Sequence, residues 1–116
     1  MRHLKKGRKF GRTSDQRRAM LRTQLYQLVM RGRLTTSVAK AKELRPMAEA
    51  LVTRAKAGTP NARRLLASRV PLAAAEKLIR DIGPRFKERP GGYTRIIRLG
   101  ARPSDGSRRA MIEFVS

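Results

Sequence analysis

Apolar side chains in the first two thirds of the chain recur every three or four positions, which is the period of an amphipathic helix. Leu21, Leu25 and Leu28 form the first such stripe. We therefore predict a helix from Ser14 to Arg31. Gly32 is expected to end it, because glycine tolerates the left-handed conformation that commonly closes a helix.

The next elements are a short strand and a long helix. Residues 33–37, RLTTS, are rich in β-branched side chains and too few for a helix, so they predict a strand. A second helix is predicted over 38–57, with Pro46 kinking it or dividing it in two because proline lacks the N–H that a helix needs. Its expected buried stripe consists of Leu44, Met47, Leu51 and Ala55.

Proline marks the start of two further helices. A third helix is predicted over 60–69, with proline at its first position. Pro71 opens a fourth helix, which Gly83 and Pro84 are expected to stop. The inward-facing side chains of this helix are expected to be Leu72, Ala75, Leu78, Ile79 and Ile82.

The period changes to two near the end of the chain, as in half-buried strands. Residues 93–99 and 109–115 alternate in this way on either side of a turn-rich segment, which predicts an antiparallel hairpin. A hairpin alone is marginal in water, and residues 33–37 supply a third strand. The predicted fold is α+β in two layers, in the order helix, strand, three helices and two strands, with the helices packed on a small three-stranded mixed sheet.

Composition narrows the function. The 116 residues include 29 Lys and Arg against 8 Asp and Glu, for a net charge of +21. Charge of this size repels itself in a compact chain, so a permanent anionic partner is expected, and a clustered basic composition is typical of nucleic-acid binding. Cysteine is absent, no apolar run is long enough to cross a membrane, and the first residues lack the apolar segment of a secretion signal. We therefore expect a cytoplasmic protein.

The first twelve residues, MRHLKKGRKFGR, are predicted to form a basic extended tail before a single globular domain over 13–116. The tail lacks any apolar period and is expected to become ordered only on a partner, where its cations contact phosphate. The first predicted helix continues this charge on its polar face. The candidate nucleic-acid-binding residues of these two segments are Arg2, His3, Lys5, Lys6, Arg8, Lys9, Arg12, Arg17, Arg18 and Arg22.

A second candidate is the loop over 83–96, in which four cations surround two glycines and a tyrosine. Glycine has no Cβ and lets a sugar-phosphate backbone approach closely, and the tyrosine can stack on an exposed base. The alternative is that the glycines only form the turn into the strand and that the tyrosine belongs to the core. The candidates from this loop are Arg85, Arg89, Gly91, Gly92, Tyr93 and Arg95.

Catalytic, metal and membrane roles find no support in the sequence. His3 is the single histidine and lies in the basic tail, and the acidic residues are scattered singly, so no acid–base pair is indicated. No His and Cys cluster indicates a metal, and no phosphate-loop pattern indicates a nucleotide cofactor. The amphipathic stripes can lie on an anionic membrane, but the chain has no Trp anchors. We expect no enzyme, no cofactor, and no membrane or small-molecule partner.

Four stretches of the sequence together resemble one known family. They occur in the same order as in that family and extend over nearly the whole chain. The stretches are MRHLKKGRKFGR, KAKELRPMAE, GPRFKERPGGYTRI and AMIEFV. The chain is similar to the bacterial large-subunit ribosomal protein L-seventeen. The resemblance implies a two-layer helix and sheet fold and a structural role in the large ribosomal subunit. It also implies binding to large-subunit rRNA near the peptide tunnel exit, with ribosomal protein L-thirty-two as a neighbour. Residues 104–109 depart from the family pattern, so their conformation does not follow from it.

Two other classes stay open on the residues alone. A basic DNA-binding or chromosome-compacting protein would carry the same charge, and it predicts tight duplex binding by a two-fold dimer. An interaction protein that recruits others through its sheet edge or helices predicts binding that survives high salt and nuclease. Competition between rRNA and duplex DNA at fixed salt separates the first class from a ribosomal role.

Overall fold

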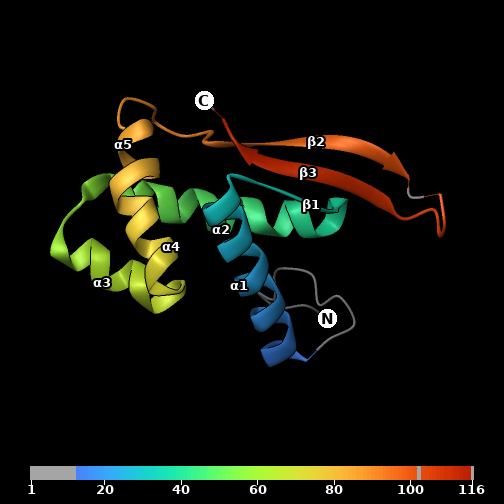
Figure 1. Cartoon of the computed structure of the whole chain (residues 1–116), viewed down its shortest axis with the longest axis horizontal. Coiled ribbons are helices and arrows are strands. Elements are labelled where there is room, and N and C mark those ends of the chain that lie inside the picture. The colour runs from blue at the N-terminus through green and yellow to red at the C-terminus, as the bar shows by residue number, and fades with distance from the viewer. Residues whose placement is uncertain (1–12, 102, 116) are drawn as a thin grey trace, which may run out of the picture.

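The computed structural model describes residues 13–101 and 103–115, so the predicted tail over 1–12 lies outside the described residues. Helices pack on a small sheet, which confirms the predicted α+β class (Figure 1). The division into a tail and one domain stays a prediction. The elements are α1 (Ser14–Arg31), β1 (Arg33–Ser37), α2 (Val38–Ala57), α3 (Pro60–Arg69), α4 (Leu72–Lys77), η1 (Leu78–Ile82), α5 (Gly83–Arg85), β2 (Thr94–Ala101) and β3 (Arg108–Phe114).

Local capping sets the bounds of α1 and α2. The Thr13 hydroxyl accepts a hydrogen bond from the Gln16 N–H, and the Gln16 side chain accepts one in return from the Thr13 N–H. Gly32 ends α1 in the left-handed conformation, with φ of +81°. The Ser37 hydroxyl caps the start of α2. Pro46 lies inside α2 without dividing it, so that helix is one continuous element.

The sheet has the strand order β1–β3–β2, with β3 in the centre. Both pairings are antiparallel, so the prediction of a mixed sheet is wrong. Strand direction depends on how the intervening helices return the chain to the sheet, which the alternation within each strand does not reveal. The register places Leu34 and Ile96 opposite Ile112, on the face that packs into the core. The tip of the β2–β3 hairpin extends beyond the helices (Figure 1).

The last helical segment continues past Gly83 and Pro84, where the sequence predicted a stop. α4 passes through the π-helical turn η1 into α5, which ends at Arg85. Pro84 is the second residue of α5 and directly follows the π-helical turn, where the regular hydrogen-bond pattern of α4 has already changed. Gly83 is buried, and a Cβ at this position would lie 2.9 Å from the carbonyl oxygen of Ala55 in α2. Gly83 therefore serves close helix packing rather than termination.

The core lies between the helices and one face of the sheet. Two residues predicted to be buried are exceptions, because Leu72 is 65% exposed and Met47 is 37% exposed. Leu72 opens α4, whose buried side chains are those of Ala74 and Ala75. Met47 lines a groove between helices, where none of the other described elements covers it. The largest fully buried side chains include Leu28, Leu44, Leu66, Leu78, Ile82 and Ile112.

Candidate nucleic-acid interface

The basic face predicted for α1 is exposed, because the leucine stripe on the opposite face packs into the core. Arg18 is 75% exposed, and Arg17 beside it is partly buried. The Arg18 Nη2 atom lies 3.1 Å from Oδ1 of Asp15, which is 94% exposed. An ion pair so open to water contributes about 0–1 kcal/mol. A phosphate group can therefore replace the carboxylate of Asp15 at little free-energy cost.

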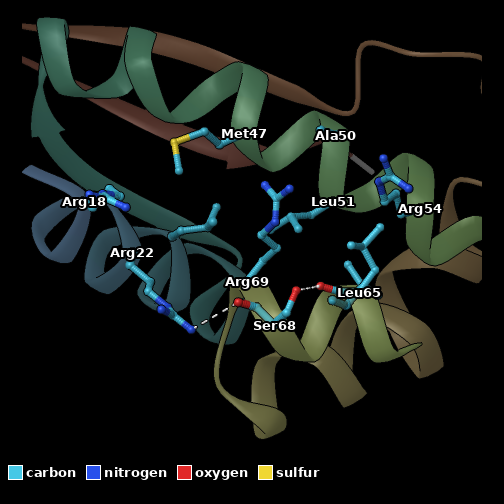
Figure 2. Close-up of a pocket in the computed structure, with 11 residues that line it drawn as sticks. Arg18, Arg22, Met47, Ala50, Leu51, Arg54, Leu65, Ser68 and Arg69 are labelled. Atoms are coloured by element: carbon cyan, nitrogen blue, oxygen red, sulfur yellow. Dashed lines mark hydrogen bonds between the residues drawn. The ribbon is translucent and has the colours of Figure 1, made fainter. Parts of the chain in front are cut away.

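Arg22 lies one turn after Arg18 and extends from α1 to α3. Its Nη2 atom is 3.5 Å from the carbonyl oxygen of Ser68, a long hydrogen bond (Figure 2). Both arginines line a cavity of about 490 Å³ between α1, α2 and α3, which we call the three-helix groove. Its apolar lining consists of Leu25, Met47, Ala50, Leu51, Leu65 and Leu66.

Sequence reasoning missed two arginines of this groove, Arg54 on α2 and Arg69 at the end of α3. Helix packing brings both to the lining of the cavity that Arg18 and Arg22 also line, and the Arg69 side chain points from α3 toward α2 (Figure 2). Within 13–101 and 103–115, neither side chain pairs with a carboxylate. One feature of the sequence could have indicated that these arginines are available to a ligand. No Asp or Glu stands three or four positions from either arginine, where it could form an ion pair on the same helix.

Two candidate cations predicted for the loop over 83–96, Arg85 in α5 and Arg95 in β2, pair with carboxylates of the same chain. Arg85 Nη2 lies 3.3 Å from the carboxylate one turn before it in η1. Arg95 Nε lies 2.5 Å from Oε1 of Glu113, its partner in the β2–β3 pairing. The backbone carbonyl of Arg89 accepts a hydrogen bond from Lys56 Nζ. A phosphate that binds Arg85 or Arg95 must therefore compete with a carboxylate of the same chain.

Tyr93 lies in the core, so its ring cannot stack on an external base and the core alternative is correct. The side chain is 2% exposed, and its ring centroid lies 5.3 Å from that of Phe86. The Thr53 hydroxyl and Lys56 Nζ, both on α2, donate hydrogen bonds to the Tyr93 hydroxyl over 3.5 and 3.1 Å. These bonds, the one from Thr53 first, lower the pKa of Tyr93 below its ordinary value of 10.0.

Gly91 and Gly92 lie in the open segment between α5 and β2. Gly92 has φ of +64°, a left-handed conformation that favours glycine and supports the turn interpretation. A Cβ at either position would meet no atom within 4 Å, so another backbone has room to approach. Contact between these glycines and RNA stays a prediction.

The remaining candidates, in the tail, lie outside the described residues. In the part of the chain that the structure describes, no three His, Cys, Asp or Glu residues are grouped as a metal would require. The helices described there are all too short or too polar to cross a membrane. The tail candidates are Arg2, His3, Lys5, Lys6, Arg8, Lys9 and Arg12.

Comparison with known proteins identifies the relatives of this chain. The sequence model described as Ribosomal protein L17 matches residues 20–115, which span most of α1 and every later element. The chain belongs to the ribosomal protein L17 family. The large ribosomal subunit protein bL17 of Gemmatimonas aurantiaca is 49% identical over 116 residues, covering 99% of this chain and 98% of the relative.

Two further members of the L17 family show similar agreement. The large ribosomal subunit protein bL17 of Thermomicrobium roseum is 46% identical over 117 residues, covering 100% of both chains. The protein of the same name from Caldanaerobacter subterraneus subsp. tengcongensis is 50% identical over 109 residues, covering 93% of this chain and 97% of the relative. These matches confirm the resemblance seen in the sequence motifs.

Proposed function

We propose that this protein binds large-subunit rRNA through its arginine and lysine side chains and thereby stabilises the folded RNA. As a member of the L17 family it is a structural constituent of the large subunit of the bacterial cytoplasmic ribosome and not an enzyme. Membership by itself does not say which surfaces hold the RNA. The proposal assigns that contact to the tail, the exposed face of α1 and the loop before β2.

The observation that carries the proposal is the excess of positive charge, which the chain's own carboxylates are too few to neutralise. There are 29 Lys and Arg for 8 Asp and Glu, so a net charge of +21 is left that no carboxylate of the chain balances. One of these acids, Glu49, instead accepts hydrogen bonds from the N–H and hydroxyl of Thr94. An external polyanion removes the resulting self-repulsion. In the described residues, the arginines that pair with carboxylates include Arg18, Arg63, Arg80, Arg85 and Arg95.

The proposed mechanism is one of positioning. The helices and sheet form a rigid support, and the guanidinium groups on α1 neutralise phosphates that lie close together in folded RNA. Arginine suits this role because its planar fork of donors matches two phosphate oxygens. Contacts of this kind fix the position of the protein without reading base sequence, so selectivity comes from the shape of the RNA.

The finer placement of the protein follows the family resemblance. We propose that it lies near the peptide tunnel exit and contacts ribosomal protein L-thirty-two. Chemical cross-linking of intact large subunits, read out by mass spectrometry, tests both points. Cross-links to L-thirty-two and to components of the exit region are expected, and cross-links confined to another face of the subunit contradict this placement.

Co-sedimentation of the protein with large subunits from a cell lysate, with and without ribonuclease, tests the function itself. We expect about one copy per large subunit and release by ribonuclease. Affinity for rRNA should fall with salt, with a log–log slope of roughly 0.7–0.9 for each phosphate neutralised. A preference for duplex DNA over rRNA at equal salt would favour the DNA-binding alternative. Retention in high salt after nuclease would favour the protein-recruiting alternative.

A further inference from the structure

The three-helix groove combines two properties that an ordinary basic surface lacks. Its floor is apolar, and Met47 at the floor is 37% exposed although it lies on the otherwise buried stripe of α2. Among the residues that the structure describes, its charged lining consists of arginine alone, with no Asp or Glu. The arginines are Arg18, Arg22, Arg54 and Arg69, contributed by three different helices.

The charge of the groove requires an anionic occupant. Four guanidinium groups around one cavity repel one another, and an anion between them converts that repulsion into attraction. Arg54 and Arg69 pair with no carboxylate in the described ranges, so their donors can bind a ligand without losing an ion pair. The basic tail of this chain is excluded as an occupant by its own positive charge.

The apolar floor requires that the anion also carry an apolar or aromatic group. A Met thioether makes favourable contacts with aromatic rings, and a guanidinium plane stacks on a nucleic-acid base. The cavity of about 490 Å³ falls within the roughly 300–1,000 Å³ that is typical of small-ligand sites. It therefore suits a single extruded group rather than a stretch of duplex.

We propose that the three-helix groove binds one unstacked nucleotide of rRNA. Its base contacts Met47 and the leucines of the floor, and its flanking phosphates lie against the guanidinium groups of Arg54 and Arg69. This inference rests on the proposed rRNA-binding function and assigns to it a site where an unpaired nucleotide is recognised. The site adds selectivity for RNA structure that phosphate contacts on α1 cannot supply.

An acidic peptide is the other anion that can bring apolar groups, and the groove suits it less well. The backbone N–H groups of a peptide need acceptors, whereas the polar side chains lining the groove are mainly guanidinium donors. The Ser68 hydroxyl already donates to the Leu65 carbonyl over 2.6 Å, and the Ser68 carbonyl accepts from Arg22. A phosphate group presents acceptor oxygens that match the donors present.

The first test removes the two arginines that have no carboxylate partner. The double variant Arg54→Ala, Arg69→Ala is compared with Arg45→Ala, Arg64→Ala, which removes the same charge from exposed positions of the same two helices outside the groove. Circular dichroism checks that both variants keep the fold. Chemical probing of large-subunit rRNA bound to the full chain then reports which unpaired bases are protected.

We expect the wild-type protein and the control variant to protect the same unpaired base, and the groove variant to lose that protection. The salt slope of rRNA binding should fall by about 1.4 in the groove variant if two single-stranded phosphates are released, at about 0.7 each. Protection that survives in the groove variant, or that is lost equally in the control, overturns the proposal.

A cross-linking test distinguishes RNA from protein in the groove. Met47→benzoylphenylalanine places a photoreactive group at the floor of the groove in protein assembled into large subunits. Cross-links to one rRNA position, or a few adjacent ones, support the proposal. Cross-links to a ribosomal protein, or no cross-link in subunits that contain the variant, overturn the groove assignment and leave the rRNA-binding function intact. If the wild-type chain itself does not bind rRNA, the proposed function fails as well.

Discussion

Replacement of Gly83 by alanine tests the tight contact between the end of the helical segment and α2. Gly83 lies where η1 passes into α5, and it is buried against the backbone of α2. A Cβ there would lie 2.9 Å from the carbonyl oxygen of Ala55, 3.0 Å from its carbonyl carbon and 3.0 Å from the carbonyl oxygen of Leu78. All three atoms belong to the backbone, so no side chain can rotate to make room.

The expected change in the free energy of unfolding is the difference between two effects. Overpacking in a filled interior costs about 1–3 kcal/mol. Alanine in place of glycine in a helix offsets about 0.5–1 kcal/mol of that cost, because the unfolded chain has less freedom to lose. Gly83→Ala should therefore lower the free energy of unfolding by about 1–2 kcal/mol. For a chain near 100 residues, Tm falls by about 4–8 °C for each kcal/mol lost.

Urea denaturation of the free protein, followed by circular dichroism in moderate salt, measures the change. Ala67→Gly on the exposed side of α3 is the matched control, since it reports the helix-propensity effect in this chain without any contact. Subtracting that effect isolates the cost of the Gly83 contact. If Gly83→Ala is as stable as the wild type, or more stable, the close approach of α5 to α2 does not constrain this position and the reasoning is refuted.

Two further predictions concern contacts that α2 makes with Tyr93, just before β2, and with Thr94, the first residue of β2. Glu49→Ala leaves the buried N–H and hydroxyl of Thr94 without the acceptor 2.9 and 2.8 Å away, and should lower the free energy of unfolding by about 1–3 kcal/mol in the same urea assay. A urea midpoint equal to that of the wild type would contradict this prediction. With Tyr26→Phe, an absorbance titration reports Tyr93 alone and should show a midpoint below 10.0, which Lys56→Met should raise. Folding lowers the pKa of Tyr93, so ionisation of its hydroxyl stabilises the folded state. This stabilisation is present above the unfolded-state pKa near 10 and is lost as the pH falls through the folded-state pKa.

The boundaries of α1 and α2 could be predicted because local chemistry decides them. A hydroxyl at Thr13 or Ser37 satisfies N–H groups only a few residues away, and the left-handed glycines Gly32 and Gly58 close the two helices within the same turn. The basic face of α1 followed equally from the spacing of its leucines. A pattern that acts within one turn is visible in the sequence itself.

The candidate site was only partly predictable, because burial and convergence are not local properties. Tyr93 stands among cations and glycines, yet packing against Phe86 places its ring in the core. Arg54 and Arg69 share no motif with the basic face of α1, and only the packing of three helices brings them to the groove with it.

The sequence by itself thus determined the helices, the strands, the excess of positive charge and the resemblance to the L17 family. Each of these depends on spacing or composition along the chain. The tertiary structure decided the antiparallel direction of β1, the packing role of Gly83, the exposure of Met47 and the meeting of four arginines over an apolar floor. These depend on distances between residues far apart in the chain, which are set only when the core is packed.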